Sequence, residues 1–178
     1  CWHAPDVTHL PHWLREHGAR FATVILSRHY IAHSCAPLVR QYAPQAKLVF
    51  DTVDLHYLRE QRAAELAQDA SAQRAALQTR KQELDLIHHA DLTLVVSDVE
   101  QTLLRDDAPN AQVAVLSNLH RLAAPGSAFA QRADVLFVGG IRHPPNVDAV
   151  LWFVSDVFPL LRAQLPMLRF HCIGGDVP

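Results

Sequence analysis

The sequence has few cysteines, little net charge and no long apolar run, and each shortage excludes a class of protein. Its 3 cysteines among 178 residues are widely spaced and form no CxxC pair, which indicates reduced thiols in a cytosolic protein and not a disulfide scaffold. A net charge of -2 gives no reason to expect a nucleic-acid partner. No apolar run reaches the length of a membrane span.

The 12 histidines lack the partners that a zinc site needs. His9 with His12, and His29 with His33, have spacings that suit zinc ligands. No cysteine or carboxylate completes a tetrahedral set beside them in the sequence. Chance pairs are expected among so many histidines, so we expect no metal site.

With 49% hydrophobic residues the chain can bury a core, and apolar runs of strand length alternate with helical segments. The predicted strands are Phe21–Leu26, Lys47–Asp51, Asp91–Val96, Val113–Leu116, Val135–Val138 and Leu168–Ile173. The predicted helices are Val7–His17, Ser34–Gln41, Tyr57–His89 with a break near Ser71, Ser97–Arg105 and Val147–Leu161. This alternation indicates parallel α/β sheets in two domains, with a linker between residues 118 and 133.

Polar residues and one glycine are expected to mark the helix ends. Ser34 and Asn146 are good N-cap residues, and Ser97 with Glu100 has the spacing of a capping box. Gly18 follows the first predicted helix, where a C′ glycine commonly closes a helix.

A dense group of polar residues follows the second predicted strand. Asp51 ends that strand, at the edge where open parallel α/β sheets bind ligands. Asp54, His56, Arg59 and Glu60 come next. The imidazole can exchange protons near neutral pH, a carboxylate can fix its tautomer, and the guanidinium can pair with phosphate. We expect His56 to lie in an open cleft, whereas the structural alternative is that the aspartates cap the following helix and Arg59 pairs with Glu60.

A second candidate site follows the strand Val135–Val138. Its loop carries Gly139, Gly140, Arg142 and His143. Glycine backbone N–H groups can approach a phosphate closely, and the dipole of the helix that Asn146 opens favours an anion. The alternative is that the two glycines form only a tight turn between strand and helix.

Several short motifs occur in a fixed order along the chain. They are Asp51-Thr-Val-Asp54-Leu-His56-Tyr-Leu-Arg59-Glu60, Ala90-Asp91, Val95-Val-Ser97 with Glu100, Val115-Leu-Ser-Asn118, Phe137-Val-Gly139-Gly140, His143-x-Pro145-Asn146-x-Asp148-Ala-Val150, Phe158-Pro159 and Ile173-Gly174. In this order they resemble the bacterial family 4 glycosyltransferases, from about Thr23 to the end of the chain.

The resemblance implies an α/β, GT-B-like fold with Rossmann-like parallel sheets in two domains, which this chain covers only in part. Residues 1–119 are then the C-terminal part of the acceptor-side domain, residues 120–133 the linker, and residues 134–178 the start of the donor-binding domain. The family's second domain continues with a donor-binding basic residue and a pair of glutamates that this sequence lacks. We therefore expect a piece of a longer protein, inactive on its own.

The resemblance also implies a retaining transferase that moves a sugar from a nucleotide-sugar to an acceptor hydroxyl, in cell-envelope polysaccharide or glycan synthesis. It implies catalytic roles for His56 and Asp54, with Asp51 and Arg59 elsewhere in the cleft. The implied donor-binding residues are Gly139, Gly140, Arg142, His143 and Asn146. The nucleotide-sugar is a substrate, and neither a cofactor nor a metal is implied. The acceptor is a glycan or lipid-linked, which fits a cytoplasmic enzyme with peripheral association at the inner face of the membrane.

Two interpretations from other classes remain open. The chain could be a non-catalytic α/β module that binds a nucleotide or a protein. It could instead be a phosphatase or a response-regulator-like domain with Asp51 as nucleophile, although that interpretation leaves the linker and the second glycine unit unexplained. The downstream sequence, with or without the glutamate pair, would separate the transferase from the binding module.

Overall fold

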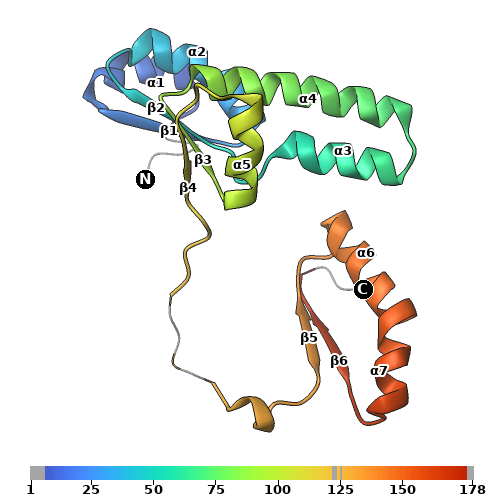
Figure 1. Ribbon diagram of the computed structural model, residues 1–178. Coiled ribbons are helices and arrows are strands. Elements are labelled where there is room, and N and C mark those ends of the chain that lie inside the picture. The colour runs from blue at the N-terminus through green and yellow to red at the C-terminus, as the bar shows by residue number, and fades with distance from the viewer. Residues whose placement is uncertain (1–6, 122–123, 125, 176–178) are drawn as a thin grey trace. The chain divides into compact units, whose positions relative to one another are not determined.

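The computed structural model describes residues 7–121, 124 and 126–175, and the chain divides into two compact units, one ending at His120 and the other beginning at Arg121 (Figure 1). Both units are α/β with parallel strands, which confirms the predicted class. Residues 1–6 and 176–178 of the two predicted domains lie outside the described residues, as do positions 122, 123 and 125 of the predicted linker.

The first unit contains a 4-stranded parallel sheet in the order β1-β2-β3-β4. Its strands are β1 (Thr23–Ser27), β2 (Lys47–Asp51), β3 (Leu92–Val95) and β4 (Val113–Val115). Its helices are α1 (Leu10–His17), the 3-10 turn η1 (Gly18–Arg20), α2 (His29–Tyr42), α3 (His56–Leu66), α4 (Ala70–His89) and α5 (Asp98–Asp107). Because all three strand pairs are parallel, the carboxyl ends of the four strands meet at one edge of the sheet.

The core of the first unit lies between one face of the sheet and helices α2, α4 and α5. The sheet contributes Leu26, Leu48, Phe50 and Val95, and the helices contribute Val39, Leu86, Ile87 and Leu104. On β1, Leu26 is buried while its neighbour Ile25 is 60% exposed, since successive side chains of a strand point to opposite faces. The apolar runs therefore predicted the strands correctly. They did not indicate which face of the sheet the helices cover.

Helix α2 begins earlier than the sequence predicted. Ser34 lies inside the helix, where its Oγ donates to the carbonyl of Tyr30 at 3.0 Å, so it is not the N-cap. The N-cap is Arg28, which has a φ of 71° and makes no side-chain capping hydrogen bond. A left-handed φ is unusual for a residue with a Cβ, so no local sequence signal marked this start.

Gly18 serves a purpose other than the predicted one. Its φ is -56°, in the right-handed region, and not the left-handed conformation that a C′ glycine often supplies. A Cβ at this position would lie 2.3 Å from the carbonyl oxygen of Tyr42. The glycine therefore allows the end of α1 to approach the end of α2.

Two further predictions are confirmed, the break in the long helical segment and the cap at Ser97. The long helical segment is divided into α3 and α4, and Asp69 caps α4 by accepting from the backbone nitrogen of Ser71 at 2.7 Å. Ser97 caps α5 by accepting from the backbone nitrogen of Glu100 at 3.3 Å. The carboxylate of Glu100 reaches back to the backbone nitrogen of Val96 at 3.1 Å, one residue before the usual partner in a capping box.

The second unit is a single strand-helix-strand unit. Its elements are the 3-10 turn η2 (Phe129–Gln131), β5 (Val135–Val138), α6 (Pro144–Trp152), a π-helical turn η3 (Phe153–Val157), α7 (Phe158–Gln164) and β6 (Phe170–Ile173), which pairs parallel with β5. The rings of Phe153, Phe158 and Phe170 contact one another, with centroids 4.8 to 6.0 Å apart.

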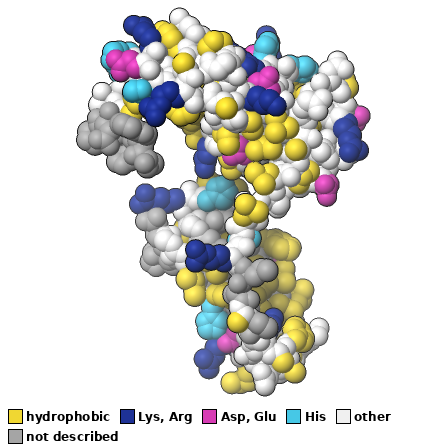
Figure 2. Space-filling view, turned by 90° about the vertical axis from the view of Figure 1, so that its left-hand side faces the viewer, with side chains coloured by type: hydrophobic (Ala, Val, Ile, Leu, Met, Phe, Trp, Pro, Cys, Tyr) yellow, Lys and Arg dark blue, Asp and Glu magenta, His cyan; other side chains and the backbone are white. Residues whose placement is uncertain are grey.

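No residue of the second unit is fully buried among those described. Exposed apolar side chains are visible as yellow surface in Figure 2, and on this unit they include Leu136, Val138, Leu151, Trp152 and Ile173. Within the described part of the chain, no helix combines the length and the apolar character that crossing a membrane requires.

Candidate functional site

The carboxyl ends of β1 and β2 are followed by two strained backbone positions. Arg28 follows β1 with a φ of 71°, and Val53 comes two residues after β2 with a φ of 66°. For a β-branched residue such as Val53 this conformation is an outlier. Strain of this kind clusters at functional sites, where the surrounding structure holds it. This edge of the sheet is therefore the candidate site of the first unit.

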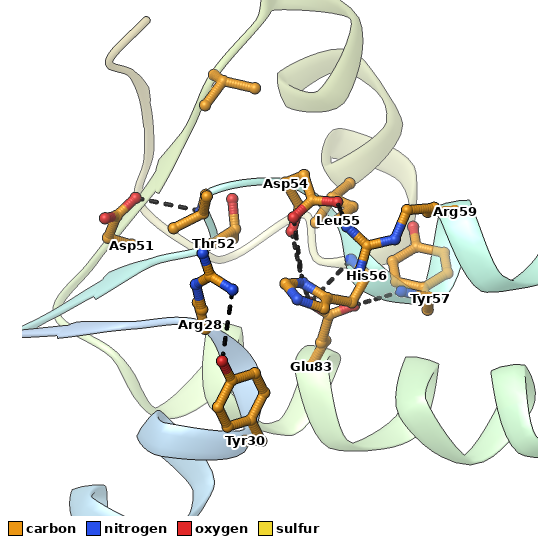
Figure 3. Close-up of polar contacts among 12 residues, drawn as sticks. Arg28, Tyr30, Asp51, Thr52, Asp54, Leu55, His56, Tyr57, Arg59 and Glu83 are labelled. Carbon is orange, nitrogen blue, oxygen red and sulfur yellow. Dashed lines mark hydrogen bonds and ion pairs between the residues drawn. The ribbon is translucent and has the colours of Figure 1, made fainter. Parts of the chain in front are cut away.

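Asp51 ends β2 as predicted, but its carboxylate is used within the fold. Oδ2 accepts from Ser27 Oγ at 2.8 Å, and Oδ1 accepts from the backbone nitrogen of Val53 at 3.2 Å. These bonds join the ends of β1 and β2 and hold the strained turn. Asp51 lies apart from Asp54 and His56 in Figure 3, which favours a structural role and gives no support to a nucleophile.

Asp54, His56 and Arg59 come together at the start of α3 (Figure 3). Arg59 Nη1 pairs with Asp54 Oδ2. The other oxygen, Asp54 Oδ1, lies 3.4 Å from His56 Nδ1, and the Asp54 carbonyl oxygen lies 3.1 Å from the same nitrogen. The carboxylate therefore orients the imidazole, as predicted for this kind of cluster. Arg59 forms its ion pair with Asp54 and not with Glu60. Because its charge is already paired, it is not available to bind a phosphate.

His56 is buried, whereas we expected it in an open cleft. The residue is only 6% exposed, and its backbone nitrogen donates to Glu83 Oε1 at 3.2 Å. Its ring centroid lies 4.7 Å from that of His29 and 6.3 Å from that of Tyr30. The imidazole is therefore surrounded mainly by protein groups and hardly contacts solvent.

Glu83 of α4 belongs to the site, and sequence reasoning missed it. Its side chain is 0% exposed, and Oε2 accepts from the backbone nitrogen of Tyr57 at 2.8 Å. Together with the bond to His56, this contact satisfies two of the N–H groups that the first turn of α3 leaves unpaired. Burial raises the pKa of Glu83, while the hydrogen bonds from Tyr57 and His56 act in the opposite direction.

His29, the first residue of α2, completes the group. Its Nδ1 is buried and has no hydrogen-bond partner among the described residues. Burial, followed by the proximity of His56, lowers the pKa of His29, which favours the neutral imidazole. The sequence spacing suggested His29 and His33 as a pair of ligands, but His33 is exposed one helical turn further on. In the fold, the ring of His29 packs against that of His56.

In the second unit, the two predicted glycines differ in role. The backbone nitrogen of Gly139 donates to the carbonyl of Ile173 at 3.0 Å, so this N–H is not available to a phosphate. A Cβ on Gly139 would lie 2.8 Å from Asn146 Nδ2, and a Cβ on Gly174 would lie 1.9 Å from the carbonyl oxygen of Gly139. Gly174 is therefore needed for the close approach of the two strand ends, whereas a Cβ on Gly139 would meet only side chains, those of Asn146 and Phe137.

Gly140 has no such constraint. Within the described structure, no atom lies within 4 Å of a Cβ built on it, and its φ is not positive. The described residues also provide no acceptor for its N–H group. An unpaired donor beside open space is available to a ligand. Of the two predicted glycines, only Gly140 can therefore offer its N–H group to an anion.

Helix α6 also begins differently from the prediction. Its N-cap is His143, and Pro144 and Pro145 occupy the first turn. Asn146 lies inside the helix, where its side-chain amide donates to the carbonyl of Gly140 at 2.9 Å. Proline has no N–H group, so this N-terminus offers fewer backbone donors than most, although the helix dipole remains.

No protein-family model, curated protein or solved structure matches this chain. The two groups of residues differ in the chemistry that they suit. The first, at the edge of the four-stranded sheet, combines two imidazoles with a buried carboxylate and suits hydrogen bonding to hydroxyls or metal coordination. The second, in the loop after β5, combines Gly140 with Arg142 and His143 and suits an anion.

Proposed function

We propose that this chain is part of a GT-B glycosyltransferase that transfers a sugar, with retention, from a nucleotide-sugar donor to an acceptor hydroxyl. The order of motifs from Asp51 to Gly174 supports this assignment, as does the presence of parallel α/β sheets in two units. In this proposal the first unit belongs to the acceptor-side domain and the second unit to the donor-binding domain.

The environment of Gly140 gives the strongest support for a donor-phosphate site. The fold gives no steric or conformational reason for a glycine at this position, because a Cβ would meet no described atom and the φ is not positive. A ligand gives one, since a side chain would occupy the space through which a phosphate reaches the N–H group. Gly174 serves as the structural contrast, because a Cβ there would meet the backbone carbonyl of Gly139.

The same loop supplies the electrostatics that the reaction needs. When the bond between the sugar and the diphosphate breaks, negative charge develops on the departing phosphate. The Gly140 N–H group, the side chains of Arg142 and His143, and the dipole of α6 all favour that charge. Stabilising the leaving diphosphate in this way accelerates transfer without a bound metal.

In the first unit, the proposal assigns the transferring sugar to the neighbourhood of His56. Asp54 orients the ring through Nδ1, and Glu83 fixes the backbone from which the ring projects. A ring held in this way can form a directed hydrogen bond to a sugar hydroxyl. A glycan or lipid-linked acceptor in cell-envelope synthesis, and work at the inner face of the membrane, follow from the family resemblance alone.

Titration of the full-length protein with a panel of nucleoside diphosphates tests the proposal, followed by incubation with the matching nucleotide-sugars. We expect saturable binding of one nucleoside diphosphate and its release from the nucleotide-sugar when acceptor is added. Binding without release from any nucleotide-sugar would favour the non-catalytic module instead. The absence of binding across the panel would contradict the proposal.

A further inference from the structure

We propose that His29, His56 and Glu83 form a binding site for a divalent transition-metal ion of the Zn²⁺ type. The inference does not rest on the proposed glycosyltransferase activity, because metal binding is measured without a nucleotide or a sugar. An ion on Nε2 of His56 would replace the direct hydrogen bond proposed between that ring and a sugar hydroxyl. It departs from the sequence-based expectation that the chain holds no metal.

The three side chains converge from three helices. His29 opens α2, His56 opens α3, and Glu83 lies in α4. Their potential ligand atoms all lie within 4.8 Å of one another. Ligand atoms around a tetrahedral zinc ion, with bonds of about 2.0 to 2.1 Å, are roughly 3.3 Å apart. Closing the group around an ion therefore takes side-chain movements on the order of 1 Å.

Burial distinguishes this group from an acidic patch on a surface. Glu83 is 0% exposed and His56 is 6% exposed. No lysine or arginine among the described residues pairs with Glu83, although a buried carboxylate is costly without a compensating charge. The hydrogen bonds from the first turn of α3 compensate only partly, because each carboxylate oxygen keeps a lone pair. A cation would supply the missing charge.

The imidazoles of His29 and His56 each have a ring nitrogen that could bind the ion. Nδ1 of His29 is buried, and the described part of the chain gives it no hydrogen-bond partner, so it is available to a metal ion. Asp54 contacts Nδ1 of His56 through its carbonyl oxygen at 3.1 Å and its Oδ1 at 3.4 Å. A proton held on that nitrogen leaves the lone pair of Nε2 for an ion, the arrangement that outer carboxylates commonly impose on metal-binding histidines.

The ligand types select the class of ion. Two imidazole nitrogens and one carboxylate oxygen suit zinc and its first-row neighbours, whereas magnesium and calcium prefer oxygen alone. Three protein ligands also leave a fourth position for water or for a substrate oxygen. An ion held here would join the starts of α2 and α3 to the middle of α4.

The test is a titration of the metal-free full-length protein with Zn²⁺, with Co²⁺ as a spectroscopic probe. The matched pair of variants is His29→Gln and His33→Gln, since His33 is an exposed histidine one turn along the same helix. We expect one Zn²⁺ to bind the wild-type protein and His33→Gln with equal affinity, and His29→Gln at least tenfold more weakly. Zn²⁺ should raise the unfolding temperature of the first two proteins but not of His29→Gln.

A second variant guards against a loss of structure. His56→Gln should lose the same Zn²⁺ binding and the visible absorption of bound Co²⁺, while its far-ultraviolet circular dichroism stays that of the wild type. Equal Zn²⁺ affinity in His29→Gln and wild type would overturn the proposal. So would a wild-type protein that shows no saturable Zn²⁺ binding.

Discussion

Glu83 Oε2 accepts a hydrogen bond of 2.8 Å from the backbone nitrogen of Tyr57, so a side chain of α4 caps the N-terminus of α3. The two residues are 26 positions apart, yet the contact fixes where α3 begins and with it the position of His56. The candidate site of the first unit therefore depends on a buried carboxylate that also serves the fold.

Replacing Glu83 with alanine should destabilise the protein strongly. The change leaves two backbone N–H groups at the start of α3 without an acceptor and creates a cavity, at a cost of about 2–4 kcal/mol. Asp85→Ala, on the same helix but with a side chain that is 63% exposed, should cost less than about 0.5 kcal/mol. Urea unfolding in the presence of a chelator measures both; equal costs would show that Glu83 is not a cap.

Asp91 should make stability depend on pH. Its Oδ2 accepts from the backbone nitrogen of Leu48 at 2.7 Å and from Arg40 Nη1 at 3.1 Å, and these bonds, led by the first, lower the pKa of Asp91 below its usual 3.8. The folded state thus favours the carboxylate. The resulting stability is fully present above the unfolded pKa and is lost as pH falls through the lowered folded pKa.

Asp91→Asn should therefore be less stable than the wild type at pH 7 by about 1 kcal/mol, a modest value because the carboxylate is partly exposed to water. The difference should shrink as the pH falls from about 5 to below 3. Chemical unfolding across this range measures it, with the exposed Asp106→Asn as control. A difference that stays constant down to pH 2 would refute the role given to the carboxylate.

Gly18→Ala should destabilise the first unit by about 1–3 kcal/mol, the usual cost of forcing an extra carbon into a packed site. The new Cβ would meet the carbonyl oxygen of Tyr42, which is backbone and cannot rotate away. Gly126→Ala, where a Cβ meets no described atom, should change stability by less than about 0.5 kcal/mol. Thermal unfolding of the two variants decides the point, and similar unfolding temperatures would count against the close approach of α1 and α2.

Much of the fold could be predicted from the sequence because strand burial and helix capping are local signals. The run Lys47–Asp51 and the cap Ser97 were both placed correctly. The start of α2 was missed because it depends on the left-handed backbone of Arg28, which has no sequence signature. Asn146 was wrongly predicted to be the N-cap of α6. It lies inside that helix, and its side-chain amide donates a hydrogen bond to the carbonyl of Gly140.

The candidate site was predicted only where its residues are close in sequence. Asp54, His56 and Arg59 lie no more than five positions apart in the sequence and were identified together. His29 and Glu83 were missed because the fold, and not their spacing, brings them to His56. One signal for Glu83 was available: it lies at helical spacing from the buried residues Ala76, Leu86 and Ile87, a position where an acid is unusual.

The most direct test of the proposed function is a calorimetric titration of the full-length protein and its Gly140→Val variant with nucleoside diphosphates. A Cβ on Gly140 meets no described atom, so the variant should fold normally, yet its side chain would block the phosphate from the N–H group. We predict that binding weakens by about 1–3 kcal/mol, the scale of one or two charge-assisted hydrogen bonds, while the unfolding temperature changes little. Gly126→Val, at another unconstrained glycine, should bind as the wild type does. Unchanged affinity in Gly140→Val would mean that the loop is only a turn, and the assignment of the donor site would be wrong.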